Sequence, residues 1–515
     1  MAFSSQATLL LFLLGLLVRL PLVNQPIKEG YRNAQTATLT AGMLENGKLR
    51  LDPIAPWRGD LNARLTQELP LYNLTVLAIM VVAPILSLDT AGHLASLLFW
   101  AASFWVVQGL WRRLLPASVS FWANLAFIIS PIGFYLSTAF MPETLLLLLS
   151  VLFLRLSLAY AESPRLVTFA GLALVALLGL LIKFPAFAHL GLFLAAVLFD
   201  RQGWTWTKRP VVWAAGAGIL GCLLLWSRYI TEVNVGHFAA WTGVENLWGF
   251  IGPLSARFTA TYYLTLVGYS FIYVVPMLCA PFVLWGLWRC LRDFRQALSA
   301  RVWIYLAVSA LVYCMVWQKA APAQNYYNLP NLVLLCGLFA LGLVESREWL
   351  QQRFPLSRFS RLCLALTFGL ALISLACLGA DLLYRPDRPT VAAAKWLKTH
   401  AARTDIVLFQ PLHSPPVTGY PHQPLLSHLS GNRSFVWTTG TPEDEKQRAW
   451  ETSRYLIITQ LPNELDYFEK IRTVKGTPPP APLPLDAGNP SYLKPLFQSP
   501  EFRCYAIENF PSPNR

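Results

Sequence analysis

Residues 29–70, EGYRNAQTATLTAGMLENGKLRLDPIAPWRGDLNARLTQELP, form a polar interval between two apolar runs. The interval carries ten charged side chains, which are Glu29, Arg32, Glu45, Lys48, Arg50, Asp52, Arg58, Asp60, Arg64 and Glu68. A connection that only crosses a membrane surface can be far shorter, and long ordered connections are usually functional. The sequence therefore predicts that this first loop, residues 25–70, holds the functional site.

Composition places the rest of the chain in a membrane. Of the 515 residues, 55% are hydrophobic and only 13% are charged, whereas soluble domains have about 25% charged residues. Apolar runs of about 20 residues recur along the chain, which is the length that spans a bilayer. These features predict a mainly α, multi-pass membrane protein and disfavour one large soluble protein with buried helices.

The net charge of +14 does not indicate a nucleic-acid partner. The lysines and arginines lie mostly in short loops between apolar runs, where positive charge sets membrane topology. No RNA- or DNA-binding module is present, so we expect membrane lipids and no nucleic acid around the chain.

The cysteines support neither a disulfide framework nor a zinc site. Of eight cysteines, seven lie in or beside apolar runs and Cys504 stands alone in the polar tail, with no CxxC pair. The first apolar run, residues 8–23, lacks a basic segment before it and a small-residue cleavage site after it. It is therefore predicted to be a retained first span.

The apolar runs predict about eleven spans within a membrane domain at residues 1–384. Residues 71–88 are apolar but short, and we interpret them as a surface or re-entrant helix. The aromatic stretch 230–266 is expected to lie partly in the interface. The predicted spans are 7–24, 92–111, 117–138, 142–160, 166–182, 184–199, 210–229, 268–289, 302–318, 327–343 and 362–380.

Loop charges then predict the topology. If residues 71–88 do not span, one class of loops holds fourteen basic residues and the other holds four, namely Lys183, Arg228, Arg257 and Lys319. The positive-inside rule makes the first class cytoplasmic. We therefore predict a plasma (inner) membrane protein with a cytoplasmic N-terminus, and with the first loop and the C-terminal region outside.

Residues 385–515 are predicted to form a small soluble α/β extracytoplasmic domain. The apolar spacing within 389–400 suits an amphipathic helix. Residues 405–410, 454–460 and 502–507 read as short buried strands. No internal repeat is visible in the sequence.

Glu29 is the first acid after the first span and lies at the predicted membrane surface. A carboxylate there can take a proton from an attacking hydroxyl or amine, or hold a divalent cation, while the alternative is an ordinary solvated acid. Residues 33–44 suit a short helix, which would bring Arg32 and Gln35 near Glu29. Arg58 belongs to a compact Trp-Arg-Gly-Asp turn. Glu68 opens the next helix, where an acid can serve only as a partner of the helix dipole.

Three further groups are predicted on the same outer face. Glu143 follows a helix-starting proline and can be a simple first-turn acid. Lys183 lies at a helix end, where a lysine can either snorkel or neutralise a lipid phosphate. Lys319 precedes the adjacent phenols Tyr326 and Tyr327, which can also be members of an aromatic belt.

Together these features resemble polytopic glycosyltransferases of the GT-C fold. Within this fold, the sequence resembles the branch that contains protein O-mannosyltransferases, the aminoarabinose transferase of lipid A and bacterial lipopolysaccharide-core transferases. The matching parts are Arg19-Leu20-Pro21, the acid with Tyr31 and Ala37 in the first loop, Glu68-Leu69-Pro70, Met141-Pro142-Glu143, Leu181-Ile182-Lys183, Tyr326-Tyr327-Asn328-Leu329-Pro330 and the small C-terminal domain.

The resemblance implies a donor that is a polyprenyl-phosphate sugar and an acceptor that is a glycolipid, polysaccharide or protein. Glu29 would be the catalytic carboxylate and Glu143 the second outer acid. The residues that would bind the donor phosphate or the acceptor are Arg32, Gln35, Arg58, Glu68, Lys183, Lys319, Tyr326 and Tyr327. Direct attack on one donor sugar implies inversion at the anomeric carbon, and a divalent metal ion is the only cofactor that the resemblance leaves open.

Two departures from the family pattern stand out. The family often has paired acids in the first loop, and here Lys28 precedes the single acid Glu29. Related transferases often place a lysine where Leu69 stands.

The alternatives to an active transferase are a flippase or transporter of lipid-linked sugars, an oligosaccharide polymerase or ligase, and a non-catalytic homologue. A transporter would favour repeated halves and broken mid-membrane helices.

Overall fold

The computed structural model describes residues 5–25, 27, 32–45, 48–56, 59, 64–66, 68–234, 255, 257, 259–269, 274–275, 279–316, 329, 331–353, 388–411, 423–436, 443–459, 493–499 and 502–508. Contacts divide the chain into two compact units. The first comprises Met1–Gln25 and Gln67–Leu383, and the second comprises Pro26–Thr66 and Tyr384–Arg515. The long first loop thus groups with the C-terminal region.

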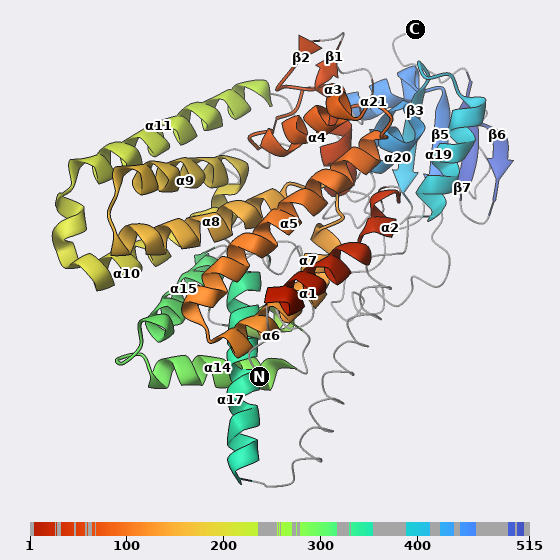
Figure 1. The fold of residues 1–515 in the computed structure, drawn as a ribbon. Coiled ribbons are helices and arrows are strands. Elements are labelled where there is room, and N and C mark those ends of the chain that lie inside the picture. The colour runs from red at the N-terminus through yellow and green to blue at the C-terminus, as the bar shows by residue number, and fades with distance from the viewer. Residues whose placement is uncertain are drawn as a thin grey trace. The chain divides into compact units, whose positions relative to one another are not determined.

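The described part of the first unit is helical (Figure 1). Its elements are α1 (Ser5–Leu17), α2 (Leu20–Val23), α4 (Leu71–Val82), α5 (Leu88–Leu114), α6 (Ala117–Ile129), α7 (Pro131–Leu136), α8 (Glu143–Glu162), α9 (Leu166–Phe187), α10 (Leu190–Gln202), the 3-10 helix η1 (Gly203–Lys208), α11 (Pro210–Val233), α13 (Ala260–Tyr269), α14 (Ala280–Arg292), α15 (Leu298–Val316) and α17 (Leu332–Arg353).

Six helical segments of the described chain are long and apolar enough to cross a membrane, so the chain is a membrane protein as predicted. They are Gln6–Val23, α5, α8, α9, α11 and α15. The helix α4 has 12 residues, a length of about 18 Å at 1.5 Å per residue. It is therefore too short to cross a hydrocarbon core of about 30 Å by itself.

A buried arginine holds the end of the first span in place. The side chain of Arg19 is fully buried and donates to the hydroxyl of Ser137 at 2.7 Å. It also donates to the carbonyls of Gly15 and Ile128 at 2.8 and 2.7 Å, and its guanidinium lies 4.0 Å from the ring centroid of Trp100. Hydrogen bonds of this kind offset the cost of burying a cation, so Arg19 acts as a structural clamp.

Ion pairs connect several helix ends of the first unit, and these ends mark one boundary of the membrane domain. Glu162, at the end of α8, pairs with Arg113 at the end of α5 and lies 3.7 Å from Arg201 of α10. Arg301 of α15 lies 3.0 Å from Asp200, also of α10. These arginines belong to the loops that are rich in positive charge. The 20 residues of α8 span about 30 Å, so Glu143 at its start lies at the opposite boundary.

The second unit contains a five-stranded sheet with the order β4-β3-β5-β7-β6. The strands β4 and β5 run parallel to β3, which lies between them, whereas β7 is antiparallel to both β5 and β6. The elements are β3 (Ile406–Pro411), β4 (Arg433–Val436), β5 (Tyr455–Thr459), β6 (Leu493–Gln498), β7 (Phe502–Ile507), α19 (Arg388–His400), α20 (Gln423–Ser430) and α21 (Glu443–Thr452).

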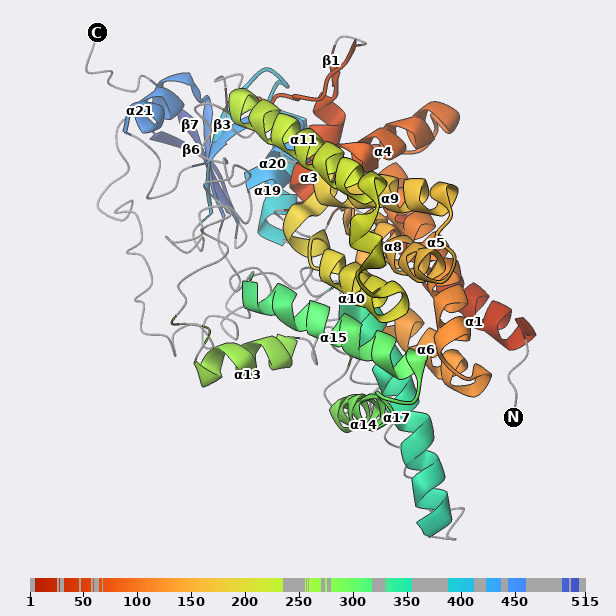
Figure 2. The same ribbon diagram turned by 90° about the vertical axis from the view of Figure 1, so that its left-hand side faces the viewer.

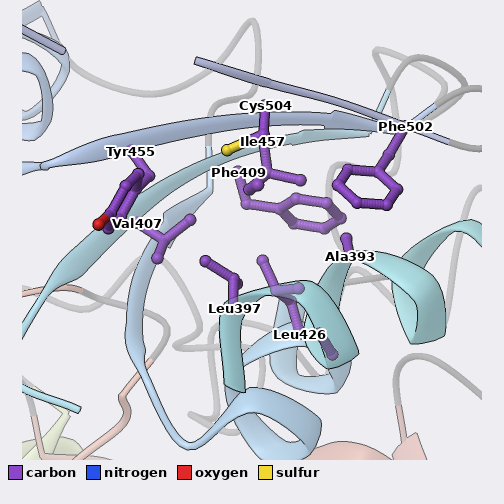
Figure 3. Packing of buried hydrophobic residues seen from close by; sticks show 10 residues of the cluster. Ala393, Leu397, Val407, Phe409, Leu426, Tyr455, Ile457, Phe502 and Cys504 are labelled. Carbon is purple, nitrogen blue, oxygen red and sulfur yellow. The ribbon is translucent and has the colours of Figure 1, made fainter. Parts of the chain in front are cut away.

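The sheet is covered on both faces, because alternate residues of a strand point to opposite sides. Phe409, Ile457 and Cys504 pack with Leu397 of α19 and Leu426 of α20 on one face (Figure 3). Residues next to them along the strands pack with α21 on the other face. Figure 2 shows the sheet nearly edge-on, with α19 and α20 on one side and α21 on the other.

The first loop adds to the open edge of this sheet. The backbone N–H of Gly59 donates to the carbonyl of Ser434 at 2.9 Å, and the N–H of Ser434 donates to the carbonyl of Pro56 at 2.9 Å. Ser434 lies on the edge strand β4. The loop also contains helix α3 (Arg32–Gly42), which contacts α20, and a small hairpin, β1 (Leu44–Glu45) with β2 (Lys48–Leu49). Edge pairing of this kind satisfies backbone groups that would otherwise stay open.

The predicted elements of the second unit are largely confirmed. The helices expected at 33–44 and 389–400 correspond to α3 and α19, and the three predicted strands correspond to β3, β5 and β7. The edge strands β4 and β6 were not predicted, because β4 has only four residues and β6 contains a proline and two polar residues among its six. The span predicted at 362–380 and most of the aromatic stretch 230–266 lie outside the described residues.

Candidate functional site

Glu143 is the first residue of α8 and is placed by the turn before it. Pro142 caps the helix with φ −72° and ψ −3°, a conformation that the proline ring favours at a helix start. The carbonyl of Pro142 accepts the first helical bond, from the N–H of Leu146 at 3.0 Å. The Glu143 side chain is 1% exposed, so it is not an ordinary solvated first-turn acid.

Lys183 lies at a kink inside α9. Its backbone is extended, with φ −156° and ψ 81°, between two stretches of helix, and Pro185 follows it. A proline inside a helix has no N–H to donate to the residue four positions earlier and pushes that carbonyl away. The carbonyl released here is that of Leu181, and it accepts the N–H of Leu69 at 3.1 Å instead. The predicted spans 166–182 and 184–199 meet at this residue, and the helix is indeed interrupted at Lys183. The stretch after the interruption ends at Phe187, before α10 begins at Leu190.

The kink directs Lys183 to Glu143. The Lys183 ammonium donates to Glu143 Oε1 at 2.6 Å, and the two side chains are 7% and 1% exposed. A charge-assisted bond of this length is among the stronger protein hydrogen bonds. Because α8 packs against α9 (Figure 1), the pair joins two helices whose paired residues are 40 positions apart in the chain. The lysine is buried and does not snorkel.

One carboxylate oxygen of the pair has no partner among the described residues. Glu143 Oε2 and the neighbouring Thr144 Oγ1 are both buried and make no hydrogen bond there. A buried polar atom that is left unsatisfied costs about 1–3 kcal/mol. An unbonded carboxylate oxygen can receive a hydrogen bond and an unbonded hydroxyl can donate one, so both atoms remain available to a polar partner.

Three other predicted residues fall in described parts of the chain. Arg32 and Gln35 belong to α3 in the second unit, where Arg32 Nη1 donates to Gln35 Oε1 at 3.4 Å. Both residues are buried. Glu68 is half-buried and lies in the turn before α4, in the first unit.

The remaining predicted residues, Glu29, Arg58, Lys319, Tyr326 and Tyr327, lie outside the described residues. Within the described residues, no group of three or more histidine, cysteine or acidic side chains could hold a metal ion. The divalent cation suggested for Glu29 therefore stays a prediction.

Sequence reasoning missed two hydroxyl groups beside the Glu143 turn. Tyr72 of α4 and Ser96 of α5 are buried and lie within hydrogen-bond distance of each other, at 2.9 Å. The available signal was the run of small residues in Ala91-Gly92-His93-Leu94-Ala95-Ser96. At helical spacing, Ala91 with Ala95 and Gly92 with Ser96 form a face that admits close neighbours.

Comparison with known proteins gives a fold but no sequence family. No protein-family model and no curated relative matches the sequence. ArnT from Cupriavidus metallidurans superposes in its apo state with a TM-score of 0.64 and 12% identity, covering 97% of both chains. The same protein bound to undecaprenyl phosphate gives a TM-score of 0.65 and 11% identity over 98% of both chains.

The oligosaccharyltransferase of Archaeoglobus fulgidus in the apo form has a TM-score of 0.56 and 12% identity, covering 88% of this chain and 69% of that one. These likenesses establish the fold. The expected GT-C fold, a helical membrane bundle with a small C-terminal α/β sheet, is confirmed.

Proposed function

We propose that this chain, which has the GT-C fold, is a membrane glycosyltransferase that moves a sugar from a polyprenyl-phosphate donor to a glycolipid, polysaccharide or protein acceptor. The observation that carries the proposal is the buried Glu143–Lys183 pair. It places a cation and an incompletely bonded carboxylate at one membrane boundary of that fold. The structures of similar fold include one bound to undecaprenyl phosphate and one in complex with a peptide and a dolichol-phosphate.

The proposed reaction is a displacement at the anomeric carbon. Glu29 accepts the proton of the attacking acceptor hydroxyl or amine as the new bond forms on the sugar. The bond between the anomeric carbon and the phosphate oxygen breaks, and its electron pair leaves with the lipid phosphate. One direct displacement inverts the configuration of that carbon.

Lys183 is the proposed cation for the departing phosphate, because fixed charges aimed at developing negative charge lower an activation barrier. Related transferases place a lysine where Leu69 stands. Here the N–H of Leu69 contacts the carbonyl of Leu181, two residues before Lys183. The Lys183 side chain therefore starts from backbone next to Leu69, which supports its assignment to the phosphate.

Glu143 keeps the ammonium oriented through Oε1, and its Oε2 is the proposed acceptor for a hydroxyl of the bound sugar. Arg32, Gln35, Arg58, Glu68, Lys319, Tyr326 and Tyr327 remain proposed contacts of the donor or acceptor. A divalent metal at Glu29 remains a proposed second role for that carboxylate. We also propose an inner-membrane location, with the C-terminal domain outside.

The test is transfer of label from radiolabelled polyprenyl-phosphate sugars, hexosyl and pentosyl, in membranes that contain the full chain. Glu29→Gln is expected to lower the rate about 100-fold or more, because a general base contributes about 10²–10⁴. Lys183→Met should also lower the rate strongly.

The matched control is Glu232→Gln, which removes an acid whose ion pair with Arg228 is exposed on α11, and it should transfer at the wild-type rate. Equal rates for wild type and Glu29→Gln would remove Glu29 from the reaction. Absence of transfer from every donor by a folded wild-type chain would reject the proposed function.

A further inference from the structure

The residues around the start of α4 contact the turn that carries Glu143. The Tyr72 ring is buried, and its hydroxyl lies 2.8 Å from the carbonyl of Gly92 and 2.9 Å from Ser96 Oγ. Ser96 in turn donates to the carbonyl of Ala139 and lies 3.4 Å from that of Met141. Burial raises the pKa of the Tyr72 hydroxyl above its ordinary value, so this group keeps its proton and remains able to donate.

Packing restricts the same turn. A Cβ atom at Gly92 would overlap the ring of Phe140, so only glycine leaves room for that ring against α5. The Phe140 ring meets the Tyr72 ring edge-on, with centroids 5.8 Å apart. Residues 139–141 are therefore held both by hydrogen bonds and by shape. Pro142 and Glu143 follow immediately in the chain, so fixing residues 139–141 also restrains the start of α8.

The segment before α4 also holds the other side of the pair. The N–H of Leu69 donates to the carbonyl that Pro185 leaves free, at Leu181. Residues 69–72 thus reach the Glu143 turn through Tyr72 and the Lys183 kink through Leu69. Two independent sets of contacts converge on the 2.6 Å bond between Lys183 and Glu143.

We propose that Tyr72, acting through Ser96, is a positioning residue that holds Glu143 against Lys183. Its importance for catalysis rests on the proposed function, whereas its effect on the ion pair does not. Losing the Tyr72 or Ser96 hydroxyl frees the 139–141 turn and moves Glu143 away from Lys183. The Lys183 amino group is then more accessible to an acylating reagent, which reacts with its neutral form.

The direct experiment measures acetylation of Lys183 by N-hydroxysuccinimide acetate in the full chain, with peptide mass spectrometry. Tyr72→Phe and Ser96→Ala each remove one hydroxyl and keep most of the side chain. Each is expected to speed acetylation of Lys183 several-fold, with Glu143→Gln as the upper reference. Ser103→Ala is the matched control, because Ser103 lies on the same helix and donates only to Phe99 in its own helix among the bonds described.

A local effect is separated from unfolding by the buried thiol of Cys336, which should stay protected from alkylation in all variants. Wild-type acetylation rates in both Tyr72→Phe and Ser96→Ala would overturn the proposal, whether or not transfer is detected. Parallel exposure of Lys183 and Cys336 in both variants would also overturn it, because the hydroxyls would then support the fold in general.

The second measurement is a double-mutant cycle on transfer. Tyr72→Phe should lower the transfer rate about tenfold in the wild type, since small misplacements of catalytic groups cost up to about 100-fold. In Lys183→Met it should change the residual rate less than about twofold, because coupled residues are not additive. Additive losses would overturn the positioning role. Faster acetylation with unchanged transfer would support the positioning of the pair and instead reject its proposed use in transfer.

Discussion

Glu143 and Lys183 gain their properties from burial and from each other. Two opposite charges with 1% and 7% exposed side chains lose hydration that only a close and well-bonded partner offsets. Such a pair adds little net stability over an apolar pair of similar size, while losing one member leaves an uncompensated charge. Its presence at the end of a membrane bundle is therefore better explained by a function than by stability.

This reasoning separates stability from activity at the residue scale. Glu143→Leu alone or Lys183→Met alone should each lower the free energy of unfolding by about 3–5 kcal/mol, because one buried charge is left unpaired. The double variant should recover most of that loss but not the transfer activity. Denaturant unfolding of the purified chain and the transfer assay measure the two effects, and a double variant as unstable as the sum of the singles would contradict the expectation.

At the scale of elements, a helix kink positions the candidate site and a strand-edge pairing holds the first loop. The kink in α9 turns Lys183 away from the helix path and frees a carbonyl for the segment before α4. In the second unit, the first loop adds its backbone to the edge strand β4 through Ser434. This pairing ties the loop that contains Glu29 in the sequence to the C-terminal sheet, although the two are more than 300 residues apart in the chain.

The edge pairing makes Gly59 more sensitive to substitution than another left-handed glycine of the same unit. Gly59 has φ 57°, and an added Cβ would overlap the Phe435 ring. Gly431 has φ 80° with nothing within 4 Å of its added Cβ. Gly431→Ala should cost about 1–2 kcal/mol for the backbone alone, and Gly59→Ala about 1–3 kcal/mol more for the clash.

Denaturant unfolding of the full chain, with a probe on the second unit, compares the two glycine variants. Equal losses of stability would show that Phe435 moves aside freely and that the loop is not held tightly against β4.

For the whole molecule, the ion pairs among Arg113, Glu162 and Arg201 place the positively charged loops at one boundary, and Glu143 with Lys183 at the other. This arrangement agrees with the loop classes used to predict topology. If the positive boundary is cytoplasmic, the end of the bundle that carries Glu143 and Lys183 lies on the outside.

Cysteine labelling tests this orientation in intact cells. Thr205 in η1 and Lys395 on α19 are both exposed, and each is replaced by cysteine in a background that carries Cys222→Ala. A membrane-impermeant maleimide should label Lys395→Cys directly and Thr205→Cys only after permeabilisation. The reverse pattern would place the C-terminal domain and the candidate site inside.

The GT-C type was expected only from the resemblance of several motifs to known glycosyltransferases, whereas hydropathy, charge and strand patterns were sufficient to predict a helical membrane protein with a small α/β domain. These properties depend on local composition and periodicity, which a sequence displays directly. Glu143 and Lys183 were identified singly, each with an ordinary alternative as a helix-start acid or a snorkelling lysine. Only the tertiary structure joins them, because their partnership depends on how α8 and α9 approach over 40 residues and on which N–H takes the carbonyl freed by Pro185. The same reason applies to Tyr72 and Ser96, whose hydroxyls gain significance only through the distant turn that they contact.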